Sequence, residues 1–453
     1  MNIKHLSILL LYFSCFTFGL YSSALAEQNR ITTEPVVVAG GDPDLSYRNQ
    51  FSDTGLTLKE ALNLTLKYNP ELAAFTEEIR ARAAVALQAG LLPNPGIAVE
   101  IENFAGQDNL KSMDGAETTL AISQLIELGN KRSKRRQVAI LEKELAEWDY
   151  QSKKLDVLTA ATKAFIQLLA LQEQVTLNDE LVLLAKQTYD AVGERVEAGK
   201  VSPLEKIQAQ VELAAARSEA KKTHRKLKAG RHKLSSFWGS ERDEFNRLVG
   251  DLTVITQIPS EETIKTHLDK NPDLARWDSE LEQREAVIDL ARSQVMPDMT
   301  FIFGVRNFQE TNSTALVAGF EIPLPLFDRN QGGISEARAN LKKARLEQRS
   351  ADITVRTGLS ETFQRLAASY IEAVTLRDEI LPAAKNAFNA VEMGYLEGKF
   401  DFIKMLDAQR TFFTVKRQSL QALEAYHLAF TDMERLVGGP LAIFLESIPE
   451  KNI

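Results

Sequence analysis

The chain has 453 residues, of which 44% are hydrophobic and 26% charged, and its formal net charge is −8. This length can hold two or three compact domains, and the composition is that of a folded protein. The acidic balance argues against nucleic-acid binding, which usually requires a basic surface.

Residues 1–26 have the pattern of a secretory signal peptide. Lys4 supplies a positive charge, an apolar run follows, and residues 24–26 supply small side chains for cleavage. The alternative is an uncleaved membrane anchor, which the short apolar run disfavours. The single cysteine, Cys15, lies inside this segment. The mature chain is therefore expected to lack disulfides, thiolate metal sites and a cysteine nucleophile.

The rest of the chain repeats one pattern after about 200 residues, which predicts a duplicated structural unit. An irregular arm is predicted at residues 27–55 and a tail at residues 441–453. We assign the first repeat to residues 56–255 and the second to residues 256–440. The matching sequence pieces are residues 69–72 and 271–274, 93–106 and 296–308, 118–132 and 316–333, and 197–200 and 396–399.

Each repeat is predicted to begin with a helix and continue into two strands. In the first repeat, Thr57 and Glu60 have the spacing of a capping box, Pro70 interrupts the helix, and Pro93 ends it. The strand candidates alternate apolar with polar or small residues, and about ten residues suit a tilted bilayer crossing. No later stretch is expected to form a membrane-spanning helix. The strands are predicted near residues 97–102, 119–123, 300–306 and 316–322.

A very long helix is predicted after each strand pair, over residues 131–198 and 331–397. Some 65 residues at 1.5 Å each make a helix of roughly 100 Å. Apolar residues at seven-residue spacing predict coiled-coil packing. Gly199 and Gly398 are expected to end these helices, and return helices are predicted over residues 203–238 and 402–437.

The predicted fold is mainly α with a small β part, and it implies a shared barrel. Four strands cannot close a barrel, and an open edge in lipid leaves backbone groups unpaired. Three copies in a cyclic assembly would supply twelve strands, with the helical hairpins continuing the tube. The alternative is a soluble coiled-coil protein with two small hairpins, which leaves the paired strands unexplained.

Residues 393–413 (MGYLEGKFDFIKMLDAQRTFF) and, more weakly, residues 192–213 resemble the TolC family of outer membrane efflux ducts. The segments PNPGIAVEIENFAG, AETTLAISQLIELGNKR and IPLPLFDRNQGG resemble its CzcC-like branch, which serves cobalt, zinc and cadmium efflux. The resemblance implies a homotrimer with a twelve-stranded outer membrane barrel and a periplasmic helical tunnel. It also implies a periplasmic adaptor and an inner membrane resistance-nodulation-division pump as partners. A duct of this family is not an enzyme and needs no cofactor.

The resemblance also suggests gate residues at the periplasmic tip. The family tyrosine matches Tyr395 and the second family aspartate matches Asp407, whereas the family arginine falls on Phe400 and the first aspartate on Lys404. Three copies of Asp407 would form an acidic ring that favours cations, and Lys404 would offset it. Glu205 occupies the similar turn of the first hairpin. The alternative for Lys404 and Asp407 is that they are ordinary solvated helix charges.

Two glycine–lysine pairs are expected at the hairpin tips, and the resemblance implies that these tips meet the adaptor. The pairs are Gly199–Lys200 and Gly398–Lys399. They lack the glycine-rich loop of a phosphate-binding motif. The histidines do not cluster at metal-ligand spacing, so no dedicated metal site is predicted.

The sequence therefore predicts a passive outer membrane exit duct for heavy-metal cations in a Gram-negative cell. Drug or protein export by the same architecture is the rival within transport. A non-transporting coiled-coil envelope scaffold is the rival of another class. An enzyme is not expected, because no nucleophile motif and no histidine–carboxylate constellation is found.

Overall fold

The structure is a computed structural model that describes residues 55–242 and 245–439. The predicted signal peptide, nearly all of the N-terminal arm and the C-terminal tail lie outside the described residues. The limits of the two repeats remain a prediction.

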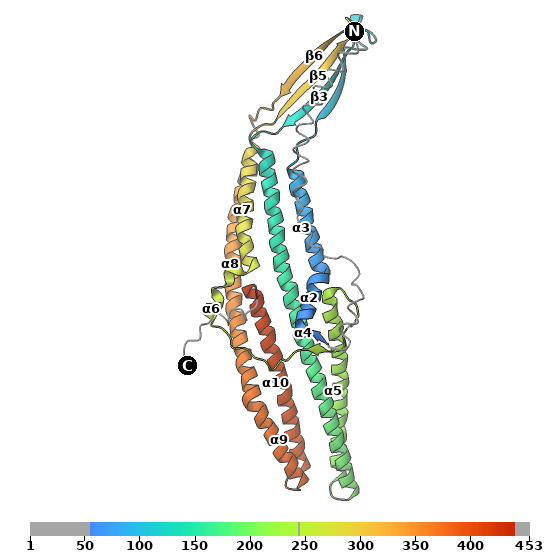
Figure 1. The fold of residues 1–453 in the computed structure, drawn as a ribbon, viewed down its shortest axis with the longest axis vertical. Coiled ribbons are helices and arrows are strands. Elements are labelled where there is room, and N and C mark those ends of the chain that lie inside the picture. The colour runs from blue at the N-terminus through green and yellow to red at the C-terminus, as the bar shows by residue number, and fades with distance from the viewer. Residues whose placement is uncertain (1–54, 243–244, 440–453) are drawn as a thin grey trace. The chain divides into compact units, whose positions relative to one another are not determined.

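The described residues form the same order of long elements twice, which confirms the predicted pattern (Figure 1). The first set is α2 (Leu58–Tyr68), α3 (Pro70–Ala89), β2 (Gly96–Glu102), β3 (Glu117–Ile126), α4 (Lys131–Glu197) and α5 (Pro203–Ser235). The second set is α7 (Pro272–Ser293), β5 (Met299–Phe308), β6 (Ser313–Glu321), α8 (Gln331–Thr375), α9 (Leu381–Leu396) and α10 (Phe402–Val437).

Several short elements escaped the sequence analysis because they are too short to show a hydrophobic period. β1 (Leu56–Thr57) pairs in parallel with β4 (Leu248–Val249). One α-helical turn and four 3₁₀ or π turns complete the described residues: α6 (Glu261–Lys265), η2 (Asp108–Leu110), η3 (Ser236–Trp238), η4 (Leu268–Lys270) and η5 (Leu376–Ile380).

The second long helix is not one regular α-helix, which corrects the sequence expectation. The π turn η5 separates α8 from α9, and Pro382 follows in the first turn of α9. Proline lacks an N–H, and its ring clashes with the carbonyl four residues earlier, so a local widening of the helix accommodates it. The first long helix, α4, contains no proline and runs unbroken for 67 residues.

We expected no stretch after residue 26 to be long and apolar enough for a membrane-spanning helix, and this expectation was wrong. The criterion concerns only length and composition. α4 contains a stretch of 18 residues that is long and apolar enough, and 44% of that stretch is buried inside the structure. The burial is explained by the position of α4, which packs against α3, α5, α7 and α10. A core helix needs the same apolar composition as a spanning helix.

The four long strands form one antiparallel sheet in the order β2-β3-β5-β6. The central pairing of β3 with β5 joins the two repeats, with Thr119 opposite Arg306 and Ala121 opposite Gly304. β2 and β6 are therefore the edges of the sheet, and each pairs on one side only. The strands lie beyond the ends of α3, α4, α7 and α8 in Figure 1.

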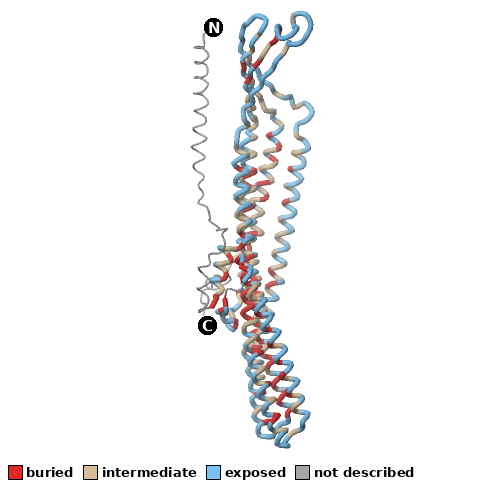
Figure 2. The backbone as a smooth tube through the Cα atoms, turned by 90° about the vertical axis from the view of Figure 1, so that its right-hand side faces the viewer, coloured by how far each residue is buried: buried red, intermediate tan, exposed pale blue. Residues whose placement is uncertain are grey.

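The main hydrophobic core lies where α4, α5, α8 and α10 meet the short elements between the repeats. Trp238, Leu234 and Met433 are at most 1% exposed there. Figure 2 shows that buried residues concentrate in the helical bundle, whereas the strands are largely exposed. The energy that holds the chain together thus comes from the helices, because burial of apolar area is the dominant favourable term.

The repeat extends to individual hydrogen bonds. Asn69 and Asn271 cap α3 and α7 with the same backbone angles, φ −66 and ψ 122. Their side-chain Nδ2 atoms donate to Phe237 O and Leu436 O, each at 2.8 Å. At this position, the two repeats therefore make the same contact between a helix cap and a backbone carbonyl.

Replacing Asn271 by alanine is expected to lower the free energy of unfolding by about 2–4 kcal/mol, because a helix cap and a buried bond to Leu436 O are both lost. Asn271 is 0% exposed. Thermal unfolding of the purified protein, followed by circular dichroism, measures the change. The matched control is Asn389→Ala on the exposed surface of α9, for which a change within about 0.5 kcal/mol is expected. An equal effect at both sites contradicts the explanation.

Candidate functional site

The sheet has two chemically different faces. Residues that alternate along the strands place large apolar side chains on one face, where they are 39–75% exposed. The members of this apolar face are Ile97, Val99, Ile101, Leu120, Ile122, Ile126, Phe301, Phe303, Val305, Leu316 and Phe320. A strand that crosses a bilayer at a tilt needs about ten residues and an apolar face toward the lipid. The exposed apolar face of this sheet suits such contact.

The opposite face, here called the polar face, carries mostly small, polar or charged side chains. It also carries four larger apolar ones: Leu125, Ile302, Phe308 and Val317. Arg306 on β5 donates from Nε to Thr119 Oγ1 at 2.8 Å and from Nη1 to Glu117 Oε2 at 2.9 Å. Its Nη2 lies 3.0 Å from Glu102 Oε2 on β2. The network thus ties β2, β3 and β5 together. Charges of this kind need water, so the polar face suits the inside of a channel.

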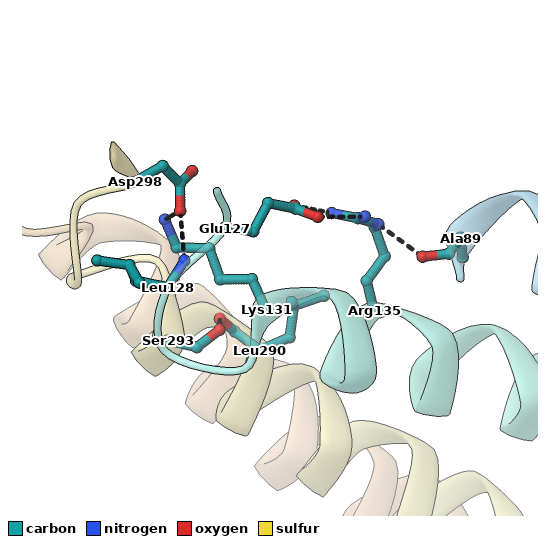
Figure 3. A network of polar contacts seen from close by, with 8 residues as sticks. All are labelled: Ala89, Glu127, Leu128, Lys131, Arg135, Leu290, Ser293 and Asp298. Atoms are coloured by element: carbon teal, nitrogen blue, oxygen red, sulfur yellow. Dashed lines mark hydrogen bonds and ion pairs between the residues drawn. The ribbon is translucent and has the colours of Figure 1, made fainter. Parts of the chain in front are cut away.

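Polar contacts also fix the junction between strands and helices (Figure 3). Asp298 Oδ1 accepts hydrogen bonds from Leu128 N at 3.0 Å and Lys131 Nζ at 2.7 Å. Arg135 binds Glu127 Oε1 at 2.7 Å and donates to Ala89 O at 3.1 Å. The junction between β3 and α4 is thereby attached both to α3 and to the entry of β5. These contacts fix the orientation of β3 and β5 relative to the helices.

The two hairpin tips have the same backbone turn. Gly199 and Gly398 adopt φ +65 and φ +77, in the left-handed region that favours glycine. The next residue closes the turn in each case: Lys200 N donates to Arg195 O at 2.9 Å, and Lys399 N donates to Gly394 O at 2.7 Å. These bonds form a Schellman motif, which confirms the predicted helix ends.

A buried cluster joins the two tips and is here called the tip cluster. Its buried members come from α4, α5, α9 and α10: Val192, Ala209, Tyr395, Phe402, Met405 and Leu406. Tyr395 is 8% exposed, and its ring centroid lies 5.9 Å from that of Phe402. The Arg195 guanidinium lies 4.7 Å from the same tyrosine ring, close enough for a cation–π interaction.

Two polar atoms in or beside the tip cluster lack a hydrogen bond. The Tyr395 hydroxyl oxygen and Glu205 Oε2 are buried without a hydrogen bond within the described residues. Burial raises the pKa of the Tyr395 hydroxyl, Arg195 opposes this, and the Glu205 carboxylate raises it further. Buried polar atoms without hydrogen bonds lower the stability of the packing in which they lie.

Of the four predicted gate residues, the structure brings Tyr395 and Glu205 together. Lys404 and Asp407 are exposed on α10 and lie outside the tip cluster. The Lys404 ammonium lies 5.1 Å from the Phe400 ring. Arg195 was missed by the sequence analysis. A signal for it was present, because Arg195 stands one residue before Val196, the position that matches Tyr395 in the second repeat.

Metal-binding groups are not gathered into a site. Within residues 55–242 and 245–439, no group of three or more histidine, cysteine, aspartate or glutamate side chains is placed to hold a metal ion. The half-buried His427 makes a hydrogen bond of 2.9 Å between Nε2 and Leu252 O. Burial lowers the pKa of His427.

Comparison with known proteins decides the family. The family model described as "Outer membrane efflux protein" matches residues 61–240 and 263–439. The chain belongs to the outer membrane efflux protein family. This efflux protein is 33% identical to the cobalt-zinc-cadmium resistance protein CzcC of Cupriavidus metallidurans over 383 residues, which are 84% of this chain and 90% of CzcC. Both findings confirm the resemblance found in the sequence, including the outer membrane location.

Further relatives and solved structures agree with this placement. The nickel and cobalt resistance protein CnrC of the same organism is 27% identical, over 63% of this chain and 68% of CnrC. The structure of the outer membrane protein VceC from Vibrio cholerae has a TM-score of 0.69 at 16% identity, covering 84% of this chain and 96% of VceC. A structure of CusC, described in terms of transmembrane channel formation, has the same TM-score and identity and covers 84% and 92%. The structural matches show the shared fold.

Proposed function

We propose that this outer membrane efflux protein is the passive exit duct for heavy-metal cations in a tripartite efflux system. The observation that supports a duct is the sheet with one apolar and one polar face. This sheet is joined directly to two long helical hairpins. The cargo is inferred from the likeness to CzcC and CnrC, which are named for resistance to cobalt, zinc, cadmium and nickel. The duct itself performs no reaction.

The duct is a homotrimer. β2 and β6 are open edges, and an open edge cannot remain unpaired in lipid. Three copies supply twelve strands, and a single rotation closes the ring. The repeated helical hairpins then form the periplasmic tunnel below the barrel.

The hairpin tips form the periplasmic entrance. Gly199, Lys200, Gly398 and Lys399 are exposed there, and they suit contact with a periplasmic adaptor that links the duct to an inner membrane resistance-nodulation-division pump. The tip cluster holds the two hairpins of each copy together and keeps the entrance narrow. Asp407 and Lys404 supply the exposed charges next to it.

Growth of a deletion strain tests the cargo. Loss of the gene is expected to sensitise the cells to a subset of zinc, cobalt, cadmium and nickel, with common drugs unaffected, and the wild-type gene on a plasmid restores growth. Sensitivity to drugs with no effect of metals leaves the duct in place and contradicts the metal cargo. Silver in the same panel, as a monovalent cation, separates monovalent from divalent cargo.

Washing of isolated membranes separates the duct from a coiled-coil scaffold. A closed barrel is held by lipid and is expected to resist alkaline and urea washes. It is also expected to run as a trimer that dissociates only on heating. Release of the protein into the wash contradicts membrane insertion.

A further inference from the structure

The internal repeat allows the contact between two copies to be located from the contact between the two halves of one copy. Within the chain, α3 packs against α4, α4 against α7, and α7 against α8. In a ring, the contact of α4 with α7 must recur as a contact of α8 with α3 of the next copy. Because matching positions make matching bonds at Asn69 and Asn271, the template for this second contact is available in residue detail.

The contact inside one copy is made by two chain corners. The corner between β3 and α4 contains Leu128, whose backbone N–H donates to Asp298 Oδ1 at 3.0 Å. Asp298 lies in the other corner, between α7 and β5. A Cβ at Gly129 would approach Ser293 O to 3.1 Å and the Met296 Cβ to 3.2 Å. The two corners therefore lie in direct contact.

Each residue of this contact has a counterpart in the other repeat. Asn130 and Asn330 precede α4 and α8 and are both left-handed, with φ 59 and φ 51. Counting back two residues matches Leu128 with Asp328. The Pro297–Asp298 pair that leads into β5 matches Pro93–Asn94, which leads into β2.

These counterparts lack partners within one copy. The backbone N–H of Asp328 and the side chain of Asn94 make no hydrogen bond within the described residues, and both residues are exposed. Large apolar side chains surround them on the same two corners: Leu91 at 47%, Leu92 at 64%, Leu324 at 75%, Leu326 at 63% and Phe327 at 90% exposed. Such exposure is unusual outside an interface.

We propose that the corner of residues 324–331 in one copy docks on residues 91–94 of the next copy, with the backbone N–H of Asp328 donating to the Asn94 side-chain oxygen. This contact rests on the proposed trimer and specifies its boundary. By the same correspondence, Arg329, the counterpart of Gly129, lies on Leu92, the counterpart of Met296, as Gly129 lies on Met296 inside one copy. The ion pair of Lys131 with Asp298 is replaced by the neutral residues Gln331 and Asn94, so the boundary between copies carries no ion pair at this point.

Disulfide trapping tests the contact, because the only cysteine of the chain is Cys15. The variant Asn94→Cys with Asp328→Cys, oxidised in isolated outer membranes, is expected to give covalent trimers that a reductant dissolves. Each single variant is expected to give none. The matched internal pair, Leu128→Cys with Asp298→Cys, is expected to oxidise within one chain without an increase in mass. A disulfide needs Cα atoms within about 7 Å, so trapping is selective for close corners.

The outcomes separate the contact from the trimer. Suppose that the native mass is that of a trimer and the internal pair oxidises. If neither Asn94→Cys with Asp328→Cys nor a second pair, Leu92→Cys with Arg329→Cys, then links the copies, the contact is overturned and the trimer stands. A wild-type protein with the native mass of a monomer overturns the trimer, and this contact with it.

Discussion

Replacing Val99 by arginine is expected to abolish the outer membrane trimer. Val99 lies in the middle of β2 on the apolar face and is 66% exposed. An arginine at the middle of a lipid-facing strand costs about 2–4 kcal/mol, and a trimer carries it three times, for a total of roughly 6–12 kcal/mol. Such a cost is comparable to the whole stability of a typical domain.

The neighbouring residue is the matched control. Glu100→Arg introduces the same side chain on the polar face, where Glu100 is exposed opposite Thr119. It is expected to leave heat-resistant trimers at near wild-type amount, measured by gel mobility of unheated outer membranes. Trimers that survive Val99→Arg, or that are lost equally in both variants, contradict the assignment of the apolar face to lipid.

The long elements could be predicted because each has a strong local signal. α4 has a stretch of good helix formers that ends at a left-handed glycine, and the strands alternate with a period of two. The capping box of Thr57 and Glu60 is present as predicted. Short elements such as β1 and β4 depend on pairing between residues 56–57 and 248–249. No local pattern can reveal a pairing of that separation.

The tip cluster shows the same limit for the functional site. Tyr395 and Glu205 were found by resemblance and by position in the turn, whereas Arg195 was not. Its role depends on the first hairpin packing against the second, which places α4 beside α9. Asp407 and Lys404 stand on the exposed side of α10, because their spacing from Phe402 and Leu406 turns them away from the buried face. The predicted gate residues therefore form two pairs in one copy: Tyr395 and Glu205 lie at the tip cluster, whereas Lys404 and Asp407 are exposed to solvent.

Replacing Tyr395 by alanine is expected to open the periplasmic entrance. The ring is buried between Phe402 and Arg195, and loss of a buried aromatic side chain costs about 3–5 kcal/mol. If only about 3 kcal/mol of this acts on the closed state, the ratio of open to closed channels rises roughly a hundredfold. Single-channel conductance in planar lipid bilayers, with no adaptor or pump present, measures this change.

The hydroxyl can be separated from the ring. Tyr395→Phe keeps the contact with Phe402 and removes an oxygen that is buried without a hydrogen bond, so its conductance is expected to match the wild type or fall slightly. Arg195→Ala removes the cation over the Tyr395 ring, so it is expected to open the channel in the same direction as Tyr395→Ala does. Wild-type conductance in both alanine variants, with trimers intact, would show that the tip cluster does not close the duct. A large increase in Tyr395→Phe would instead assign closure to a hydroxyl bond formed between copies.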